Sequence, residues 1–127
     1  MKKHEFLCEL DKLNLDKNKY CIIASGSMLM YGLCEECNDI DIRTTKDLFD
    51  NLNEKYHMKQ SNRYDYVYEL SDIIDVNCKN FDSNMIEFVD GYPVEKLEVN
   101  LKWMKENNRP KDKEKIAKIE NFLKNEW

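Results

Sequence analysis

The sequence predicts an α+β (mixed α/β) fold, in which helices pack against one small mixed sheet. Short apolar or alternating runs, such as 20–24 and 39–42, have the length and period of strands. Segments at the start and the end of the chain have apolar residues three and four positions apart, which is the period of helices. Strand runs and helix runs follow one another along the chain, and this order is typical of a sheet covered by helices.

The first half of the chain is predicted to hold three helices and two strands. Phe6 and Leu10 recur at helical spacing, and 20–24 reads as a buried strand. The strict alternation in 39–42 is strand periodicity. Thr44 or Thr45 can cap the helix that follows. The expected elements are a helix within 1–13, a strand at 20–24, a short helix at 28–33, a strand at 39–42 and a helix from 44 or 45 to about 56.

The second half is predicted to hold three strands and then two helices. Ser71 and Asp72 form a tight turn between two runs that pair as antiparallel strands. The residues 90–93 are expected to lead directly from a third strand into a helix. Pro110 ends that helix, because the residue before a proline resists helical geometry. The expected elements are strands at 63–70, 73–78 and 85–89, a helix carrying Leu97, Leu101 and Met104, and a last helix carrying Ile116, Ile119, Phe122 and Leu123.

Composition limits the class of protein. The 127 residues fit one domain over 1–127, with a core at 20–78 and a helical tail at 95–126. No stretch approaches the roughly 20 apolar residues of a membrane helix. Five cysteines without an apolar leader predict reduced thiols, so we expect a cytoplasmic protein without membrane contact. The net charge of -5 argues against a broad phosphate-binding surface but allows a local basic patch.

Two carboxylates alternate with isoleucines in the strand predicted at 39–42. Residues two apart in a strand point to the same face, so Asp39 and Asp41 project together while Ile40 and Ile42 face the core. Two adjacent carboxylates repel each other, and a cation such as Mg²⁺ removes that repulsion. An exposed acidic edge on an amphipathic strand is the alternative interpretation.

A serine–glycine–serine sequence follows the strand predicted at 20–24. Ser25, Gly26 and Ser27 precede a predicted helix, where free backbone N–H groups favour an anion. Gly26 would allow a phosphate to approach the backbone closely. A plain turn is the alternative. Together with the carboxylates at 39–42, this segment indicates a site for a metal-bound polyphosphate.

These two motifs resemble the nucleotidyltransferase superfamily related to DNA polymerase beta. That family has a glycine followed by glycine or serine, then a gap, and then a strand in which acidic and apolar residues alternate. A later strand supplies a third carboxylate with apolar neighbours, which Asp75 matches better than Asp72 in its predicted turn. The resemblance implies a nucleotidyltransferase-type fold, with Asp39, Asp41 and Asp75 as catalytic residues and as ligands of Mg²⁺ or Mn²⁺.

The C-terminal third is similar to the tail of small bacterial nucleotidyltransferases, including lincosamide-resistance enzymes and abortive-infection toxins. The matching residues are Leu97-Glu98, Met104-Lys105, Arg109, Lys111-Asp112 and Ile116. The resemblance adds Lys105 and Arg109 to Ser25, Gly26 and Ser27 as nucleotide-binding residues. A solvated basic helix face is the alternative for the lysines.

The resemblance implies transfer of a nucleoside monophosphate from a nucleoside triphosphate to an acceptor hydroxyl. The acceptor is expected to be a small molecule such as an antibiotic. Alternatives are a toxin-type enzyme that acts on tRNA or protein, with a cognate antitoxin as partner, and a non-catalytic nucleotide-binding module. The chain lacks the extra helical domain that larger members use to hold an acceptor.

Two other groups of residues are expected to have structural roles. Cys34 and Cys37 have the spacing of half a zinc site, but no second pair follows at suitable spacing, so they are interpreted as part of a loop. Tyr64, Tyr66 and Tyr68 alternate along one predicted strand face. They are interpreted as core residues rather than as a surface on which bases stack.

Overall fold

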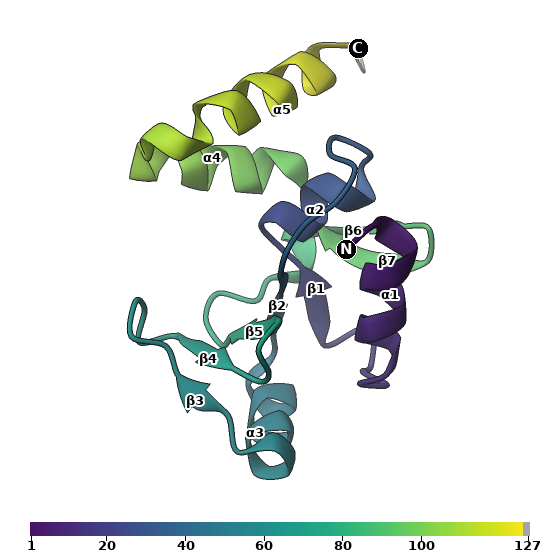
Figure 1. Cartoon of the computed structure of the whole chain (residues 1–127), viewed down its shortest axis with the longest axis vertical. Helices are drawn as coiled ribbons and strands as arrows, with labels where there is room; N and C mark the ends of the chain where they lie inside the picture. Colours follow the sequence, from purple (N-terminus) through teal and green to yellow (C-terminus); the bar gives the residue numbers. More distant parts are fainter. Residues whose placement is uncertain (126–127) are drawn as a thin grey trace.

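One mixed sheet with helices around it forms the protein (Figure 1). The computed structural model describes residues 1–125. This architecture confirms the predicted α+β class. In chain order the elements are α1 (Lys3–Asp11), β1 (Tyr20–Ile22), α2 (Ser25–Met30), β2 (Ile40–Thr44), α3 (Lys46–Tyr56), β3 (Lys59–Gln60), β4 (Val67–Glu69), β5 (Ile74–Asn77), β6 (Ile86–Val89), β7 (Tyr92–Glu95), α4 (Leu97–Asn107) and α5 (Lys113–Asn125), with 3-10 turns at Ser83–Met85 and Pro110–Asp112.

The strand β2 occupies the middle of the sheet. The spatial order is β3-β4-β5-β2-β1-β7-β6, so β2 lies between β1 and β5. It pairs antiparallel with β1 and parallel with β5. The outer pairs β3–β4, β4–β5 and β6–β7 are antiparallel, whereas β1 and β7 run parallel. The parallel pairing of β2 with β5 brings together two segments that are more than thirty residues apart in the sequence.

Local sequence explains the bounds of α3. The Thr45 side chain accepts a hydrogen bond from the Leu48 N–H, which caps the helix as predicted. His57 follows the last turn in the left-handed conformation, with φ 51°, and its N–H bonds to the Asn53 carbonyl. Leu48, Phe49 and Leu52, on the apolar face of the helix, are buried. Helix α3 therefore begins and ends close to where the sequence predicted.

The main core lies against one face of the sheet. The isoleucines Ile22, Ile40 and Ile42 are fully buried there and pack with residues of α1 and α3. Full burial of one such side chain contributes about 1.5–3 kcal/mol. The Phe6 side chain of α1 is also fully buried. Because alternate residues of β2 are committed to this core, the residues between them must point to the other face.

A second, smaller apolar cluster holds the two C-terminal helices. Its buried members are Met28 of α2, Leu97 and Met104 of α4, and Ile119 of α5. Figure 1 shows α4 and α5 stacked on each other beside α2. None of the helices within residues 1–125 is long and apolar enough to cross a membrane.

The hairpin formed by β6 and β7 corrects one prediction. The segment 90–93 was expected to lead into a helix, but Tyr92–Glu95 forms strand β7 between β1 and β6. Asp90 and Gly91 have φ values of 52° and 83°, the positive values that a two-residue hairpin turn requires. An Asp-Gly pair between apolar residues is a hairpin signal. Pro93 concealed it, because proline is rare inside a sheet.

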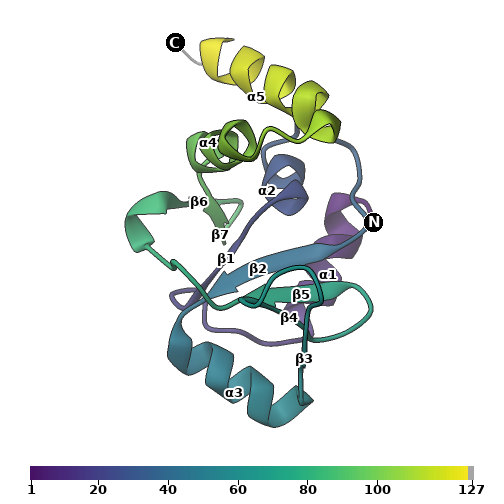
Figure 2. The same ribbon diagram turned by 90° about the vertical axis from the view of Figure 1, so that its left-hand side faces the viewer.

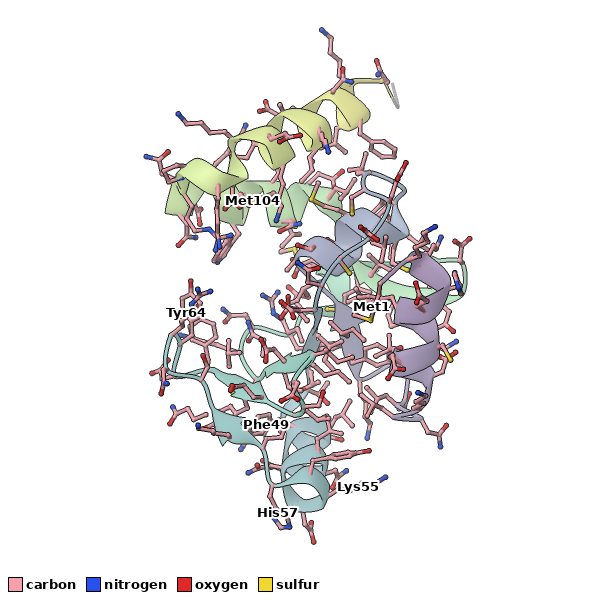
Figure 3. The ribbon with its side chains drawn as sticks, viewed as in Figure 1. Met1, Phe49, Lys55, His57, Tyr64 and Met104 are labelled. Carbon is pink, nitrogen blue, oxygen red and sulfur yellow. The ribbon has the colours of Figure 1, made fainter. Side chains whose placement is uncertain are left out.

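The three tyrosines of 64–68 do not share one environment. Tyr68 packs on Phe49, with ring centroids 4.8 Å apart, and joins the core as expected. Tyr64 is 36% exposed, so its placement in the core was wrong. Figure 3 shows Tyr64 at the tip of the β3–β4 loop, away from Phe49. The predicted strand 63–70 is shortened to Val67–Glu69, and the antiparallel pairing with β5 is confirmed.

Candidate functional site

Two aspartates lie side by side at the centre of the sheet. Asp41 of β2 and Asp75 of β5 are direct partners in the parallel register. The neighbours of Asp41, Ile40 and Ile42, are fully buried on the opposite face, so the predicted alternation is confirmed. Asp39 precedes β2 and is exposed. Asp72 lies in an exposed bend before β5, and it has no register partner on β2.

The local electrostatics are those of crowded carboxylates. Burial, reinforced by the charges of Asp75 and Asp39, raises the pKa of Asp41 to about 7. The Lys115 ammonium opposes this shift in the Asp41 pKa. The pKa of Asp75 is also raised, first by burial and then by the charges of Glu69 and Asp39. Asp41 and Asp75 would therefore gain from a cation that holds both of them ionised.

This pair fits a magnesium ion that takes part of its coordination from the substrate. Within residues 1–125, no three His, Cys, Asp or Glu side chains converge closely enough to hold one metal ion together. Mg²⁺ is usually bound through one or two carboxylates, with water and phosphate oxygens completing the shell. Asp41 and Asp75 in register meet that requirement, and Asp39 lies two residues before Asp41, just outside the strand.

A cavity of about 350 Å³ opens beside these carboxylates. Its acidic lining residues are Glu36, Asp39, Asp41 and Glu114, whereas Asp75 does not line it. The same cavity is also lined by Ser25 and by three lysines from the C-terminal segment, Lys111, Lys115 and Lys118. Figure 2 shows why these meet: the first turns of α5 lie on the same side of the molecule as the start of β2.

The contact between Lys115 and Ser25 joins α5 to α2. The Lys115 ammonium donates a hydrogen bond to the Ser25 hydroxyl, with 3.3 Å between Nζ and Oγ. Lys118 lies one turn further along α5 and is 3.7 Å from Glu114. The sequence argument missed Lys115 and Lys118. Their spacing from Lys111, four and seven residues, is the helical signal that would have grouped them.

Two predicted phosphate contacts lie elsewhere. Lys105 is 3.4 Å from Glu120 on the exposed face between α4 and α5. Arg109 donates to the buried Asp112, at 2.7 Å, and its guanidinium lies over the Trp103 ring. Neither Lys105 nor Arg109 lines the cavity. Both satisfy their charge within the C-terminal helices, which sequence spacing alone could not distinguish from a role at the phosphates.

The serine–glycine–serine segment is divided between the cavity and the interior. Helix α2 begins at Ser25 rather than near Met28, so the segment forms its first turn. Ser27 is fully buried, and its hydroxyl donates to the Ala24 carbonyl. A Cβ at Gly26 would lie 2.7 Å from side-chain atoms of Ile22 and Phe6. Gly26 therefore allows close packing inside the protein, and Ser25 is the member of the three that lines the cavity.

The cysteine pair lies in the loop between α2 and β2. Cys34 is half-buried, and Cys37 is buried with its Sγ 3.5 Å from the Asp39 carbonyl. Burial raises the pKa of the Cys37 thiol to about 11, so it is neutral at pH 7. Both residues line the cavity. The pair therefore shapes the wall beside Asp39, as expected for a loop.

The cavity lining combines both signs of charge. Its carboxylates suit a cation, and its lysines and serine hydroxyl suit an anion. A metal-bound polyphosphate carries both charges. No family model, curated protein or solved structure matched the chain.

Proposed function

We propose that the protein is a metal-dependent nucleotidyltransferase with a nucleotidyltransferase-type fold. One observation carries the proposal: Asp41 and Asp75 are direct partners on parallel strands, and Asp41 lines a cavity that three lysines also line. Two carboxylates whose pKa values are raised by burial and by neighbouring carboxylates are poised for a divalent cation. The same residues also matched the family pattern in the sequence.

Asp41 and Asp75 would hold the divalent ion, Mg²⁺ or Mn²⁺, with substrate oxygens in place of the third carboxylate expected from Asp39. When bound, such an ion offsets the negative charge that gathers on the α-phosphate during transfer. Ser25 and Lys115 would bind the β- and γ-phosphates through charge-assisted and hydroxyl hydrogen bonds. Lys111 and Lys118 would add positive charge on the same side.

The reaction exchanges one bond to phosphorus for another. The acceptor oxygen forms a bond to the α-phosphorus while the bond to the oxygen bridging the β-phosphate breaks, and pyrophosphate leaves. The hydroxyl proton would pass to a carboxylate oxygen of Asp75. Lys115 and Ser25 hold the leaving pyrophosphate in place as its charge develops.

The proposed acceptor is the hydroxyl of a small molecule. The net charge of -5 disfavours a long nucleic acid, which needs an extended basic surface. Contacts with the three phosphates of one nucleotide would be enough to explain the three lysines that line the cavity. Transfer to a tRNA end or to a protein side chain is the competing outcome.

Labelled nucleotides test this proposal directly. The protein is incubated with each of the four nucleoside triphosphates, labelled at the α-phosphate, together with Mg²⁺ and a bacterial extract. The extract is then separated into small-molecule, RNA and protein fractions. We expect label in the small-molecule fraction and an equal amount of released pyrophosphate. Label in RNA or protein would move the acceptor to the toxin-type class, and no transfer with any triphosphate would contradict the enzyme.

A second candidate is a nucleotide-binding module without turnover. The observation that favours it is that no three potential ligands converge on one metal position within residues 1–125. Such a module would bind Mg²⁺ and a triphosphate tightly but release no pyrophosphate. Measuring binding by calorimetry beside pyrophosphate release separates the two candidates.

A further inference from the structure

The backbone is strained where β1 passes into α2. Ala24 has φ 58° and ψ -135°, a conformation that residues with a side chain rarely adopt. Such outliers persist only where the surrounding structure holds them, and they concentrate at functional sites. Ser25, the residue after Ala24, lines the cavity. The contacts that hold Ala24 therefore bear on the geometry of the site.

Three hydrogen bonds converge on the Ala24 carbonyl. The Ser27 N–H and the Ser27 hydroxyl donate to it at 3.1 and 2.7 Å. The Asn100 side-chain amide of α4 donates to the same carbonyl at 3.3 Å and to the Ser27 hydroxyl at 3.2 Å. Asn100 is 6% exposed and Ser27 is fully buried. This closed network ties α4 to a turn that lies more than seventy residues earlier in the chain.

The turn at Ala24 links Asp41 to the serine that contacts Lys115. The Ile23 N–H, one residue before Ala24, bonds to the Asp41 carbonyl at 3.0 Å. The Ser25 hydroxyl, one residue after Ala24, accepts the hydrogen bond from Lys115. The conformation of Ala24 therefore sets where Ser25 stands relative to Asp41.

We propose that Asn100 is a positioning residue: through Ala24 and Ser27 it fixes the phosphate end of the cavity relative to the metal-binding carboxylates. This inference rests on the proposed function. Asn100 has no place in the cavity lining and touches no reacting group. Loss of its amide should misalign the triphosphate and the carboxylates, while the flexible lysines still bind the phosphates. The effect should therefore fall on kcat rather than on KM.

The test compares Asn100→Ala, Ser27→Ala and the double variant. Each is assayed by pyrophosphate release with Mg²⁺, the triphosphate that the wild type transfers best and the extract fraction that it labels. Rates are expressed per nucleotide-binding site, titrated with the same triphosphate below the melting temperature of each variant. We expect kcat to fall about tenfold or more in each single variant, with KM for the triphosphate changed less than threefold. The double variant should lose little more than one single variant, because both belong to one network.

Asn107→Ala is the matched control. Asn107 is an exposed asparagine of the same helix, and its amide bonds only to the Trp103 carbonyl. Its kcat should stay within twofold of the wild type. A kcat within twofold in Asn100→Ala, or additive losses in the double variant, would overturn the inference. If Asn100→Ala does not fold, Ser27→Ala decides the question alone by the same criteria.

The outcome separates this inference from the function beneath it. A wild-type protein that transfers no nucleotide would reject the proposed enzyme before any variant is compared. An active wild type with an equally active Asn100→Ala variant would reject only the positioning role.

Discussion

The carboxylates and the lysines of the candidate site are held in place by different means. Backbone pairing fixes Asp41 opposite Asp75, and the flanking isoleucines are buried on the other face of the strand. Lys115 and Lys118 lie on α5, which packs through the small second cluster. Lysine side chains carry four rotatable bonds, whereas an aspartate next to a paired backbone has little freedom.

The carboxylates and the lysines should therefore tolerate displacement of their neighbours to different degrees. Carboxylates placed by a sheet cannot shift to compensate for a lost neighbour, so changes there should be severe. Lysines on a helix can adapt to a displaced phosphate, so changes there should be graded. Substitutions at the carboxylates and at the lysines test this contrast, and the largest effect is expected at the carboxylates.

Asp41→Asn should lower nucleotide transfer by more than about a hundredfold, because the metal loses a charged ligand in the middle of the sheet. The fold should persist, since the strand keeps its buried isoleucines. Transfer rate and circular dichroism measure the two effects. Asp72→Asn is the control, because Asp72 lies in an exposed bend and should leave the rate unchanged. Equal losses in both variants would contradict the assignment of Asp41.

Lys115→Ala should weaken binding of a triphosphate by roughly tenfold or more, because a charge-assisted hydrogen bond contributes about 1.5–3 kcal/mol. Binding of the matching nucleoside should not change. Lys105→Ala is the matched control, since Lys105 is exposed and pairs with Glu120 instead. Calorimetric titration with ATP at fixed Mg²⁺ compares the two variants. A larger loss in Lys105→Ala would return Lys105 to the phosphate site and remove Lys115 from it.

The metal-free protein should become less stable as pH rises from about 4 to about 7. The folded-state pKa of Asp41 lies above its ordinary value, so the native state binds more protons than the unfolded state in this window. The free energy of unfolding should fall by on the order of 1 kcal/mol per pH unit. Urea unfolding at several pH values measures it. Asp41→Asn should flatten the slope, and Mg²⁺ with ATP should raise stability at pH 7. If Asp41→Asn leaves the slope of the unfolding free energy against pH unchanged, Asp41 is not the cause of the pH dependence.

Lys118→Ala should have the smallest effect, about twofold or less on triphosphate affinity. Its side chain is largely exposed and shares its charge with Glu114, so water screens its pull on the phosphates. Titration with ATP at low and high salt measures it. The twofold loss should shrink at high salt. A loss as large as that of Lys115→Ala would show that both lysines contact the phosphates directly.

The sequence predicted well those parts of the molecule that follow a regular pattern of apolar residues or begin at a capping residue. The alternation in 39–42 predicted which residues face the core, and the capping threonine predicted the start of α3. Strand β7 was missed although Asp90 and Gly91 form a hairpin signal, and Pro93 pairs with Phe88 inside that hairpin. Tyr64 was misplaced because the alternation of tyrosines begins three residues before strand β4 does.

The same difference between local pattern and tertiary packing holds for the residues of the candidate site. The two-residue period in 39–42 indicated Asp39 and Asp41, which is a local property of a strand, whereas Asp75 was indicated by the resemblance to nucleotidyltransferases. It could not distinguish Lys105 from Lys115, because both are lysines on amphipathic helices. Only the packing of α5 turned Lys115 towards Ser25 and left Lys105 beside Glu120.

The sequence by itself determined the α+β class, the face of β2 that carries the carboxylates, and the residue types suited to a cation. The tertiary structure decided that Asp41 pairs with Asp75, that Asn100 holds the turn at Ala24, and which lysines face the cavity. The physical reason is the distance along the sequence over which each effect acts. Periodicity and capping act over a few residues along the chain, whereas a site assembled from β2, β5, α2 and α5 exists only once distant segments have packed together.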